Sequence, residues 1–348
     1  GHEFRPEYRN LPVLRDQFPE VPIAAFTATA TPTVQKDVVK LLELRSPLLV
    51  RGDFDRREIF YRVVRKVKIE KQIREFVEAH PQEPGIIYRA TRRSVDESAA
   101  ALRAAGITAV AYHAGLSDAE RRENQSAFVR DEVQVVVATI AFGMGIDKSN
   151  VRWVVHGDLP RSVEAYYQET GRCGRDGEQS DTCLFYSPGD IRKIRYHIDR
   201  MEVEEERERA ERNLREILRF VDAGTCRRTH LLSHFGQEHH GNCGRCDVCT
   251  GELSTTDATE AAQKLLSACY RTGQRFGAHY LVQLLLGKAD ERMRRQGHDG
   301  MPTFGVGAEE PKEYWLSIAK DAEAAGLLAR RDGERSGLRL THEIGRAS

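Results

Sequence analysis

Residues 133–148 read VQVVVATIAFGMGIDK, an apolar run that passes directly into a glycine-containing loop. Val133 to Ala138 are apolar except for Gln134, which is typical of a central parallel strand covered on both faces. The loop, 138–148, follows the carboxyl end of this strand, where open α/β sheets bind their ligands. We therefore expect the loop to touch a phosphate, a ribose or a nucleic-acid backbone.

Strand and helix patterns alternate on both sides of this run. The expected strands are 85–88, 108–112, 151–156 and 182–186, and the expected helices between them are 94–105 and 117–129. Ser117 and Glu120 form a capping box at the start of the second helix. Alternation of this kind predicts an α/β fold with a doubly wound parallel sheet.

The segments that flank the predicted sheet have other patterns. Short apolar runs at 22–26 and 48–50, around a helical pattern at 32–44, are too little to close a domain. A long, charge-rich helical stretch is expected over about 190–221. Beyond it lie helical patterns at 258–272, 278–286 and 312–326, then two short strands, 327–330 and 338–340, around Asp332 and Gly333. Helices followed by a small hairpin are typical of a winged helix-turn-helix, although other small α+β domains share this pattern.

Four of the seven cysteines have the spacing of a metal site: Cys226, Cys243, Cys246 and Cys249. Three of them form a C-x-x-C-x-x-C run with glycines that permit a tight turn. Four thiolates suit tetrahedral Zn²⁺ and leave no open position for a substrate, so the metal is expected to be structural. An iron–sulfur cluster and a chance grouping of buried cysteines are the alternatives.

A second group of residues, 168–177, reads QETGRCGRDG. Arg172 and Arg175 lie three residues apart on a glycine-containing turn, so both can face one ligand. The planar guanidinium group matches phosphoryl oxygens, so this pattern indicates a phosphate site. A solvated surface loop is the alternative. The glycine-rich loop upstream, in which Asp147 can hold a hydroxyl, favours the phosphate site.

Bulk composition leaves the function open. The 348 residues include 53 basic and 53 acidic side chains, a balance that neither supports nor excludes a nucleic-acid partner. No stretch approaches the ~20 apolar residues of a membrane helix, and the first residues lack the apolar core of a signal peptide. The expected location is the cytosol, where cysteines serve metal binding or burial more often than disulfides.

At this point the residues resemble a known family. The run from 138 to 177 resembles motifs V and VI of superfamily 2 helicases in their RecQ version. Residues 25–30 resemble motif III, residues 86–88 with Thr91 and Arg92 resemble motif IV, and residues 112–116 resemble the RecQ segment after it. Residues 1–8 resemble the second half of the aromatic-rich loop. The cysteine spacing, with residues 274–277 and 297–299, resembles the RecQ zinc and winged-helix domains.

The resemblance spans essentially the whole chain and implies four parts. Residues 1–52 would be the remnant of a first RecA-like helicase lobe, and 53–189 the second RecA-like lobe. Residues 190–254 would form a zinc-binding module, and 255–348 a winged-helix DNA-binding domain.

The resemblance also implies roles for single residues. Arg175 would be the arginine finger on the γ-phosphate of ATP, with Arg172 beside it, and Gln168 would couple the nucleotide state to DNA. Gly145 and Asp147 would line the ATP cleft.

A second set of residues would contact DNA. The residues implied to grip the phosphates of a DNA strand are Thr91, Arg92 and Thr139, and those implied to sense single-stranded DNA are Phe4 and Arg5.

The chain departs from the family pattern at three positions near these sites. Arg89 stands where the family usually has cysteine or another small residue, and Ala90 replaces a polar one, so the details of the strand grip stay open. Cys173 stands where alanine is usual and is interpreted as a tolerated small residue.

The sequence contains no G-x-x-x-x-G-K-[ST] loop and no D-E-x-H box. The phosphates of ATP require backbone amides and a lysine, and Mg²⁺ requires an acidic residue. We therefore expect ATP and Mg²⁺ to bind only together with an N-terminal helicase lobe, and the chain alone to be inactive. It would be a fragment of a longer helicase or a remnant that has lost catalysis.

By resemblance, the parent enzyme would couple ATP hydrolysis to 3′-to-5′ unwinding of duplex DNA in recombination and repair. Its expected partners are DNA junctions, the N-terminal lobe and a single-stranded DNA-binding protein, in the cytosol and nucleoid of a bacterium. Two alternatives remain: a non-enzymatic zinc and winged-helix DNA-binding protein, and an RNA helicase of the same superfamily.

Overall fold

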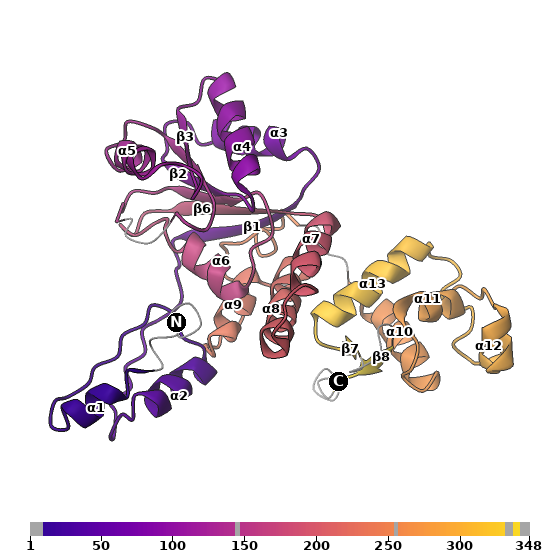
Figure 1. The fold of residues 1–348 in the computed structure, drawn as a ribbon. Coiled ribbons are helices and arrows are strands. Elements are labelled where there is room, and N and C mark those ends of the chain that lie inside the picture. The colour runs from indigo at the N-terminus through magenta and orange to yellow at the C-terminus, as the bar shows by residue number, and fades with distance from the viewer. Residues whose placement is uncertain (1–9, 143–146, 254–256, 331–336, 342–348) are drawn as a thin grey trace. The chain divides into compact units, whose positions relative to one another are not determined.

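The computed structural model describes residues 10–142, 147–253, 257–330 and 337–341 (Figure 1). The chain divides into two compact units. The first comprises Gly1–Arg192 and Arg227–Cys246, and the second comprises Lys193–Cys226 and Asp247–Ser348. Among the described residues, no helix is both long enough and apolar enough to cross a membrane.

A parallel six-stranded sheet forms the centre of the first unit. Its strands are β1 (Ile59–Arg65), β2 (Gly85–Tyr88), β3 (Ala109–Tyr112), β4 (Val135–Ala138), β5 (Trp153–His156) and β6 (Ser180–Tyr186). Their order is β1-β6-β5-β2-β4-β3, and every pair is parallel. The predicted α/β fold is therefore confirmed. The valine-rich strand β4 is fully buried and lies between β2 and the edge strand β3, parallel to both, so the prediction of an interior parallel strand covered on both faces is confirmed.

Helices cover both faces of this sheet. In chain order they are α3 (Ile69–Glu78), α4 (Arg92–Ala104), α5 (Asp118–Val129) and α6 (Val163–Thr170). The apolar residues of α3 and α4 share one core with alternate residues of the strands, among them Ile87, Val137 and Val155. Because successive strand residues point to opposite faces, His156 lies on the other face, where its ring is 5.0 Å from that of Tyr166 in α6. The predicted capping box of Ser117 is present at the start of α5.

The first described residues contain two short helices, α1 (Val13–Gln17) and α2 (Pro32–Leu41). The apolar runs beside them form no strand. The side chains of Phe26, Leu48 and Val50 are 94%, 88% and 84% exposed. These residues therefore contribute little to the core of the first unit.

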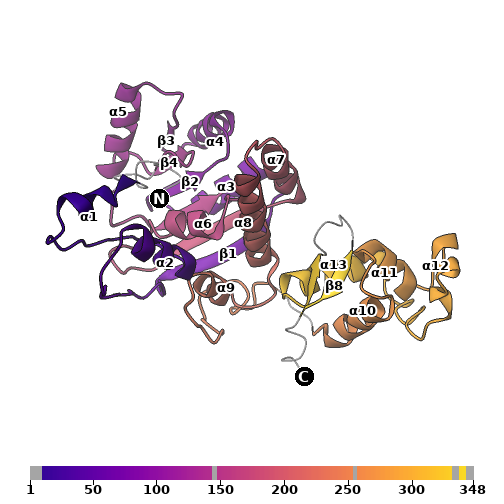
Figure 2. The same ribbon diagram turned by 60° about the horizontal axis from the view of Figure 1, so that its bottom comes forward.

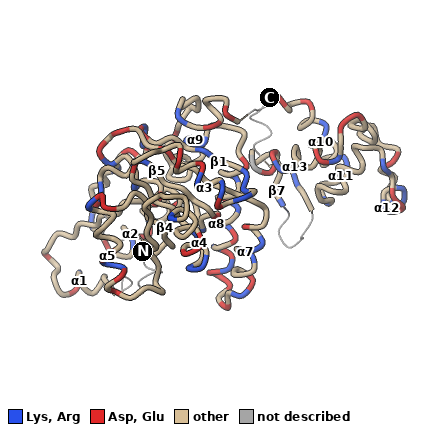
Figure 3. Tube along the Cα trace, turned by 90° about the horizontal axis from the view of Figure 1, so that it is seen from above, with Lys and Arg blue, Asp and Glu red and all other residues tan. Residues whose placement is uncertain are grey.

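The charge-rich helical stretch predicted after the sheet is confirmed and consists of two helices, α7 (Pro188–Ile198) and α8 (Glu204–Asp222). The N–H of Asp199 donates to the carbonyl oxygen of Arg195 (2.8 Å) at the end of α7, and residues 201–203, before α8, are not helical. Basic and acidic residues are mixed along α8, whereas the charged residues of α7 after Asp190 are basic (Figure 3).

The C-terminal part of the second unit has the helices and the hairpin that its sequence predicts. The elements are α10 (Thr259–Arg271), α11 (Ala278–Leu285), α12 (Glu291–Arg295), a 3-10 turn (His298–Gly300), α13 (Lys312–Ala324), β7 (Leu328–Arg330) and β8 (Leu338–Leu340). The two strands are antiparallel, and Leu265, Leu281 and Trp315 lie in one buried core. The predicted turn at Asp332 and Gly333 lies outside the described residues, and α12 is an element that the sequence analysis missed.

Gly85 is a position at which the sheet has no space for a side chain. It pairs with Trp153 in β5, whose indole is fully buried and donates from Nε1 to the carbonyl oxygen of Glu83 (3.1 Å). A Cβ at residue 85 would lie 2.0 Å from Cδ2 of that indole.

We therefore expect Gly85→Ala to lower the free energy of unfolding by about 2–3 kcal/mol, because the indole cannot move without disturbing the core. Urea unfolding followed by tryptophan fluorescence would measure the change. Gly52→Ala is the matched control, since nothing lies within 4 Å of a Cβ there. Equal stability of the two variants would contradict this account of the core.

Candidate functional site

The turn that follows α6 carries both predicted catalytic arginines and is held by backbone contacts. Arg56 donates from Nη1 to the carbonyl oxygen of Gly171 (3.0 Å) and from Nη2 to that of Cys173 (2.9 Å). Gly174 has a φ of 66°, which favours glycine, and its N–H donates to the carbonyl oxygen of Val151 (3.0 Å). The turn is thus attached to the chain just before β1 and just before β5.

The two arginines of this turn lie in one neighbourhood. Nη1 of Arg175 is 3.4 Å from Oδ1 of Asp147. The Asp147 side chain is 97% exposed, so water weakens this pair. Burial raises the pKa of Tyr88 well above its ordinary value, and the positive charges of Arg172 and Arg175 act in the opposite direction. Arg175 thus lies beside Asp147, and both arginines of the turn act on Tyr88.

Gln168, near the end of α6, reaches the N-terminal segment. Its Nε2 donates to Oγ1 of Thr29 (2.6 Å), which lies in the stretch that resembles motif III. The hydroxyl of Thr27 donates to the carbonyl oxygen of Thr29 (2.9 Å). Gln168 thus joins the helix before the arginine turn to residues outside the sheet.

The predicted strand-gripping residues follow directly after β2 and β4. Thr91 is the N-cap of α4, and its hydroxyl accepts from the N–H of Ser94 (3.1 Å). Arg92 is exposed. The N–H of Thr139 donates to the carbonyl oxygen of Tyr112 at the end of β3 (3.1 Å). These residues therefore share the carboxyl-terminal edge of the sheet, whereas the arginine turn is fastened at the amino-terminal edge.

Three other predicted site residues, Phe4, Arg5 and Gly145, lie outside the described residues. Their predicted contacts with DNA and ATP stay predictions.

Arg89, the departure from the family pattern, is buried and binds three side chains. Its Nε donates to Oδ2 of Asp158 (2.9 Å), and its Nη1 donates to Oε1 of Glu70 (2.7 Å) and to the hydroxyl of Ser98. Oδ2 of Asp158 also accepts from the N–H of Ala90 (3.0 Å). Arg89 is thus a structural residue whose partner holds the backbone just before Thr91.

The same carboxylate continues the network along the sheet edge. Nζ of Lys66 lies 2.9 Å from Oδ1 of Asp158 and 2.6 Å from Oδ1 of Asp190, which is buried in the first turn of α7. Burial acts to raise the pKa of Asp158, but the neighbouring charges of Arg89 and Lys66 outweigh it and hold the pKa below its ordinary value. The network therefore spans the carboxyl ends of β1, β6, β5 and β2.

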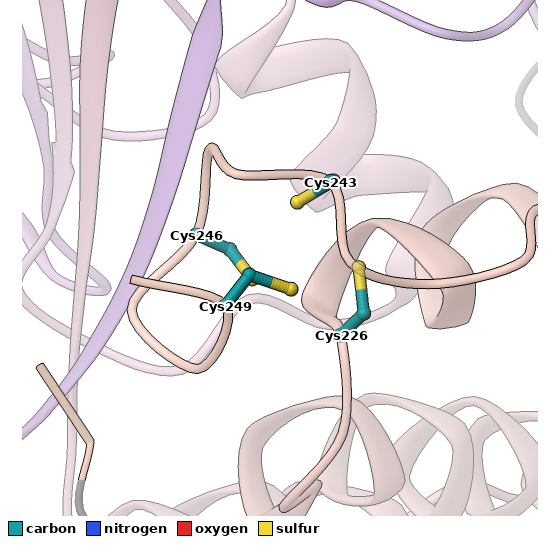
Figure 4. A group of neighbouring side chains, drawn as sticks. All are labelled: Cys226, Cys243, Cys246 and Cys249. Carbon is teal, nitrogen blue, oxygen red and sulfur yellow. The ribbon is translucent and has the colours of Figure 1, made fainter. Parts of the chain in front are cut away.

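The four predicted metal ligands form one cluster (Figure 4). The sulfur atoms of Cys226, Cys243, Cys246 and Cys249 all lie within 4.8 Å of one another. Cys226 directly precedes α9 (Arg227–His234), and the other three lie on the loop after it. In that loop Gly241 and Gly244 have φ values of 82° and 64°, which permit the sharp turns between thiols.

The donor set fits zinc. In a tetrahedral site with Zn–S bonds of about 2.3 Å the sulfur atoms lie about 3.8 Å apart, so small shifts of these side chains would close the site. The N–H of Arg245 donates to the sulfur of Cys243 (3.4 Å), a contact typical of metal-bound thiolates. Four protein sulfurs leave no position for a substrate, which indicates a structural metal.

Of the remaining cysteines, Cys173 lies in the arginine turn. Burial raises its pKa to about 12, so its thiol is not reactive. This supports its interpretation as a tolerated small residue.

Sequence reasoning missed Arg56, which holds two carbonyl groups of the arginine turn. It also missed Glu169, whose Oε2 lies 2.7 Å from Nε2 of the buried His156. Arg56 belongs to no motif, and its partners in the turn lie more than a hundred residues away. Glu169 lies within the stretch 168–177, but nothing in that pattern indicates its pairing with His156, 13 residues before it.

Three protein-family models match the chain: the helicase conserved C-terminal domain over residues 67–177, RecQ zinc-binding over residues 188–250 and the RQC domain over residues 252–347. The second match, which includes all four clustered cysteines, is consistent with a structural zinc.

Curated relatives match along most of the chain. The ATP-dependent DNA helicase RecQ of Pasteurella multocida is 43% identical over 328 residues, which are 94% of this chain and 52% of that protein. The protein of the same name from Haemophilus influenzae is also 43% identical, over 94% of this chain and 53% of that protein. That from Bacillus subtilis is 39% identical, over 88% and 52%. The chain thus spans about half the length of these relatives.

Among solved structures, S. cerevisiae Dbp5 bound to RNA and ADP BeF3 is 20% identical with a TM-score of 0.41, over 54% of each chain. The matches to the three family models and to the curated proteins lead to one conclusion: this chain belongs to the RecQ helicase family and carries its C-terminal part, with the helicase C-terminal, RecQ zinc-binding and RQC domains.

Proposed function

We propose that the chain supplies the arginine-finger lobe, the zinc module and the winged helix of an ATP-dependent 3′-to-5′ DNA helicase. The observation that carries this proposal is the fixed turn after α6, which presents Arg172 and Arg175 together and whose helix reaches Thr29 through Gln168. Its proposed parts are residues 1–52 of a first lobe, 53–189 as the second lobe, 190–254 as the zinc module and 255–348 as the winged helix.

In this proposal a lobe outside the chain holds ATP and Mg²⁺, and closure of the two lobes brings Arg175 to the γ-phosphate. The weak, exposed pair with Asp147 costs little to break, so Arg175 can exchange the carboxylate for phosphoryl oxygens. Arg172 would lie beside it. Charge that develops on the γ-phosphate would then be stabilised by a guanidinium on a turn whose backbone Arg56 binds. Gln168 would report the nucleotide state to the first lobe.

DNA would bind at the opposite edge of the sheet. Thr91 and Arg92 lie at the N-terminus of α4, where backbone N–H groups and the helix dipole favour a phosphate. Thr139 follows the adjacent strand β4. The winged helix would add phosphate contacts to the duplex.

The proposal predicts that this chain alone hydrolyses no ATP above background, with or without DNA. Joined to a front lobe of RecQ type, it should hydrolyse ATP, and Arg175→Ala should then lower kcat by about 10³-fold. Arg130→Gln is the matched control, since Arg130 pairs with Glu132 outside the turn. Turnover by the isolated chain that vanishes in Arg175→Ala would mean that it holds ATP by itself.

DNA contact at the start of α4 can be tested with two neighbouring arginines. Arg92→Gln should weaken binding of a labelled single-stranded oligonucleotide roughly tenfold and reduce the salt dependence by about 0.7 in log–log slope, as for one lost phosphate contact. Arg93→Gln should change neither quantity, because Arg93 pairs with Glu97. Fluorescence anisotropy over a salt series measures both, and similar losses in the two variants would argue against this site.

A structural zinc makes a stoichiometric prediction. The purified chain should contain one zinc per molecule, and Cys246→Ser should lose it and unfold the segment around it, because metal binding and folding are coupled. Cys269→Ser removes a buried thiol outside the cluster and should keep the zinc. Colorimetric zinc release measures this, and iron with sulfide in place of zinc would point to a cluster instead.

A further inference from the structure

Residues 53–59 contact two different parts of the first unit. On one side are α6 and the arginine turn, and on the other are residues 227–246, which include α9 and two of the clustered cysteines. Figures 1 and 2 show α6 and α9 beside each other. None of the residues 53–59 belongs to the site as described so far, except Arg56.

Arg228, two residues after Cys226, binds this segment through hydrogen bonds. Its Nη1 donates to the carbonyl oxygen of Arg56 (2.7 Å) and its Nη2 to that of Ile59 (2.8 Å), and it also pairs with the carboxylate of Asp55. Only 3% of Arg228 is exposed. A buried guanidinium with all these partners fixes the path of the backbone before β1.

Three further residues of the metal-bearing part hold the same segment. Arg245, between two of the clustered cysteines, donates from Nη2 to the carbonyl oxygen of Glu58 (2.7 Å). Gln237 accepts from the N–H of Phe54 through Oε1 (2.9 Å). The ring of Phe235 stacks on that of Phe54, with centroids 4.8 Å apart and planes within 10°.

The other side of the segment holds the arginine turn. Arg56 binds the two carbonyl groups already described, and the hydroxyl of Tyr167 in α6 donates to the carbonyl oxygen of Phe54 (2.8 Å). Cγ of Glu58 would lie 2.8 Å from a Cβ at Gly174. The segment is therefore in direct contact with the arginine turn through Arg56 and Glu58, and with α6 through Phe54.

We propose that the zinc-binding part of the chain positions the arginine turn through residues 53–59, with Arg56 as the positioning residue. The inference deepens the proposed function, because it assigns the metal a role in aligning Arg172 and Arg175. A group that stabilises transition-state charge must be held within about 0.5 Å. Outside the bonds from Arg56, the described backbone bonds of the turn are few and mostly local.

The experiment is amide hydrogen exchange of the zinc-loaded chain, followed by mass spectrometry of a peptide covering 171–177. Arg56→Gln should speed exchange of this peptide roughly five- to tenfold, as expected for the loss of one or two net hydrogen bonds. Arg103→Gln is the matched control, since Arg103 also donates to a backbone carbonyl, that of Ala109, far from the turn. It should leave the peptide unchanged.

A second variant tests the zinc side. Arg228→Lys keeps the positive charge but cannot bind two carbonyl groups in a fork. It should retain one zinc per chain and still speed exchange at 171–177, as should removal of zinc from the unaltered chain by a chelator. Peptides from β2 and β4 should keep their slow exchange. Unchanged exchange at 171–177 in Arg56→Gln, or in the chelated chain, would overturn the proposal.

A kinetic measurement separates positioning from the proposed function. In the chain joined to a front lobe, Arg56→Gln should lower kcat for ATP by about 10- to 100-fold with an unchanged KM, since a misplaced catalytic group costs rate and not binding. Failure of the unaltered joined protein to hydrolyse ATP would reject the proposed function, while the exchange data would still decide the positioning. A rise in KM with constant kcat would overturn the alignment role.

Discussion

The close packing of β5 against β2 at Gly85 fixes the register of these two strands. The indole of Trp153 occupies the space that a side chain at residue 85 would need, so neither strand can slide. This register places Tyr88, Ala138 and His156 at one level. Because all strands are parallel, everything that follows them emerges at a single edge, and the segments that precede them gather at the other. The separation of the proposed DNA contacts from the arginine turn follows from this register.

The buried charged side chains have different hydrogen-bond partners at the two edges of the sheet. At the carboxyl-terminal edge, buried charges neutralise one another in pairs, as Asp158 does with Arg89 and Lys66. At the amino-terminal edge, Arg56 and Arg228 also pair with carboxylates, those of Glu58 and Asp55. In addition, each of the two donates to two backbone carbonyl groups. Arg56 therefore fixes the backbone of the arginine turn, and Arg228 fixes the backbone just before β1.

The sequence predicted those elements whose signal is local. The valine run 133–138 and the C-x-x-C-x-x-C spacing depend on neighbours along the chain, and both were found. Strand β1 was not predicted, because Arg62 and Arg65 interrupt its apolar residues. Helix α3 was not predicted either, although its apolar residues have helical spacing and place Ile73, Phe76 and Val77 on one buried face. Arg56 could not have been found, because its partners lie more than a hundred residues away.

Arg89 shows how a departure from a family pattern acquires a structural meaning. The sequence reveals only that a large charged residue stands where a small one is usual. A buried guanidinium is strongly destabilising unless its charge is paired, and here the carboxylates of Asp158 and Glu70 pair with it and Ser98 accepts a further hydrogen bond. Asp158 also binds the N–H of Ala90, so the same carboxylate neutralises the substitution and fixes the backbone that leads to Thr91. The departure therefore changes what holds the loop before α4, while the loop keeps Thr91 as the cap of that helix.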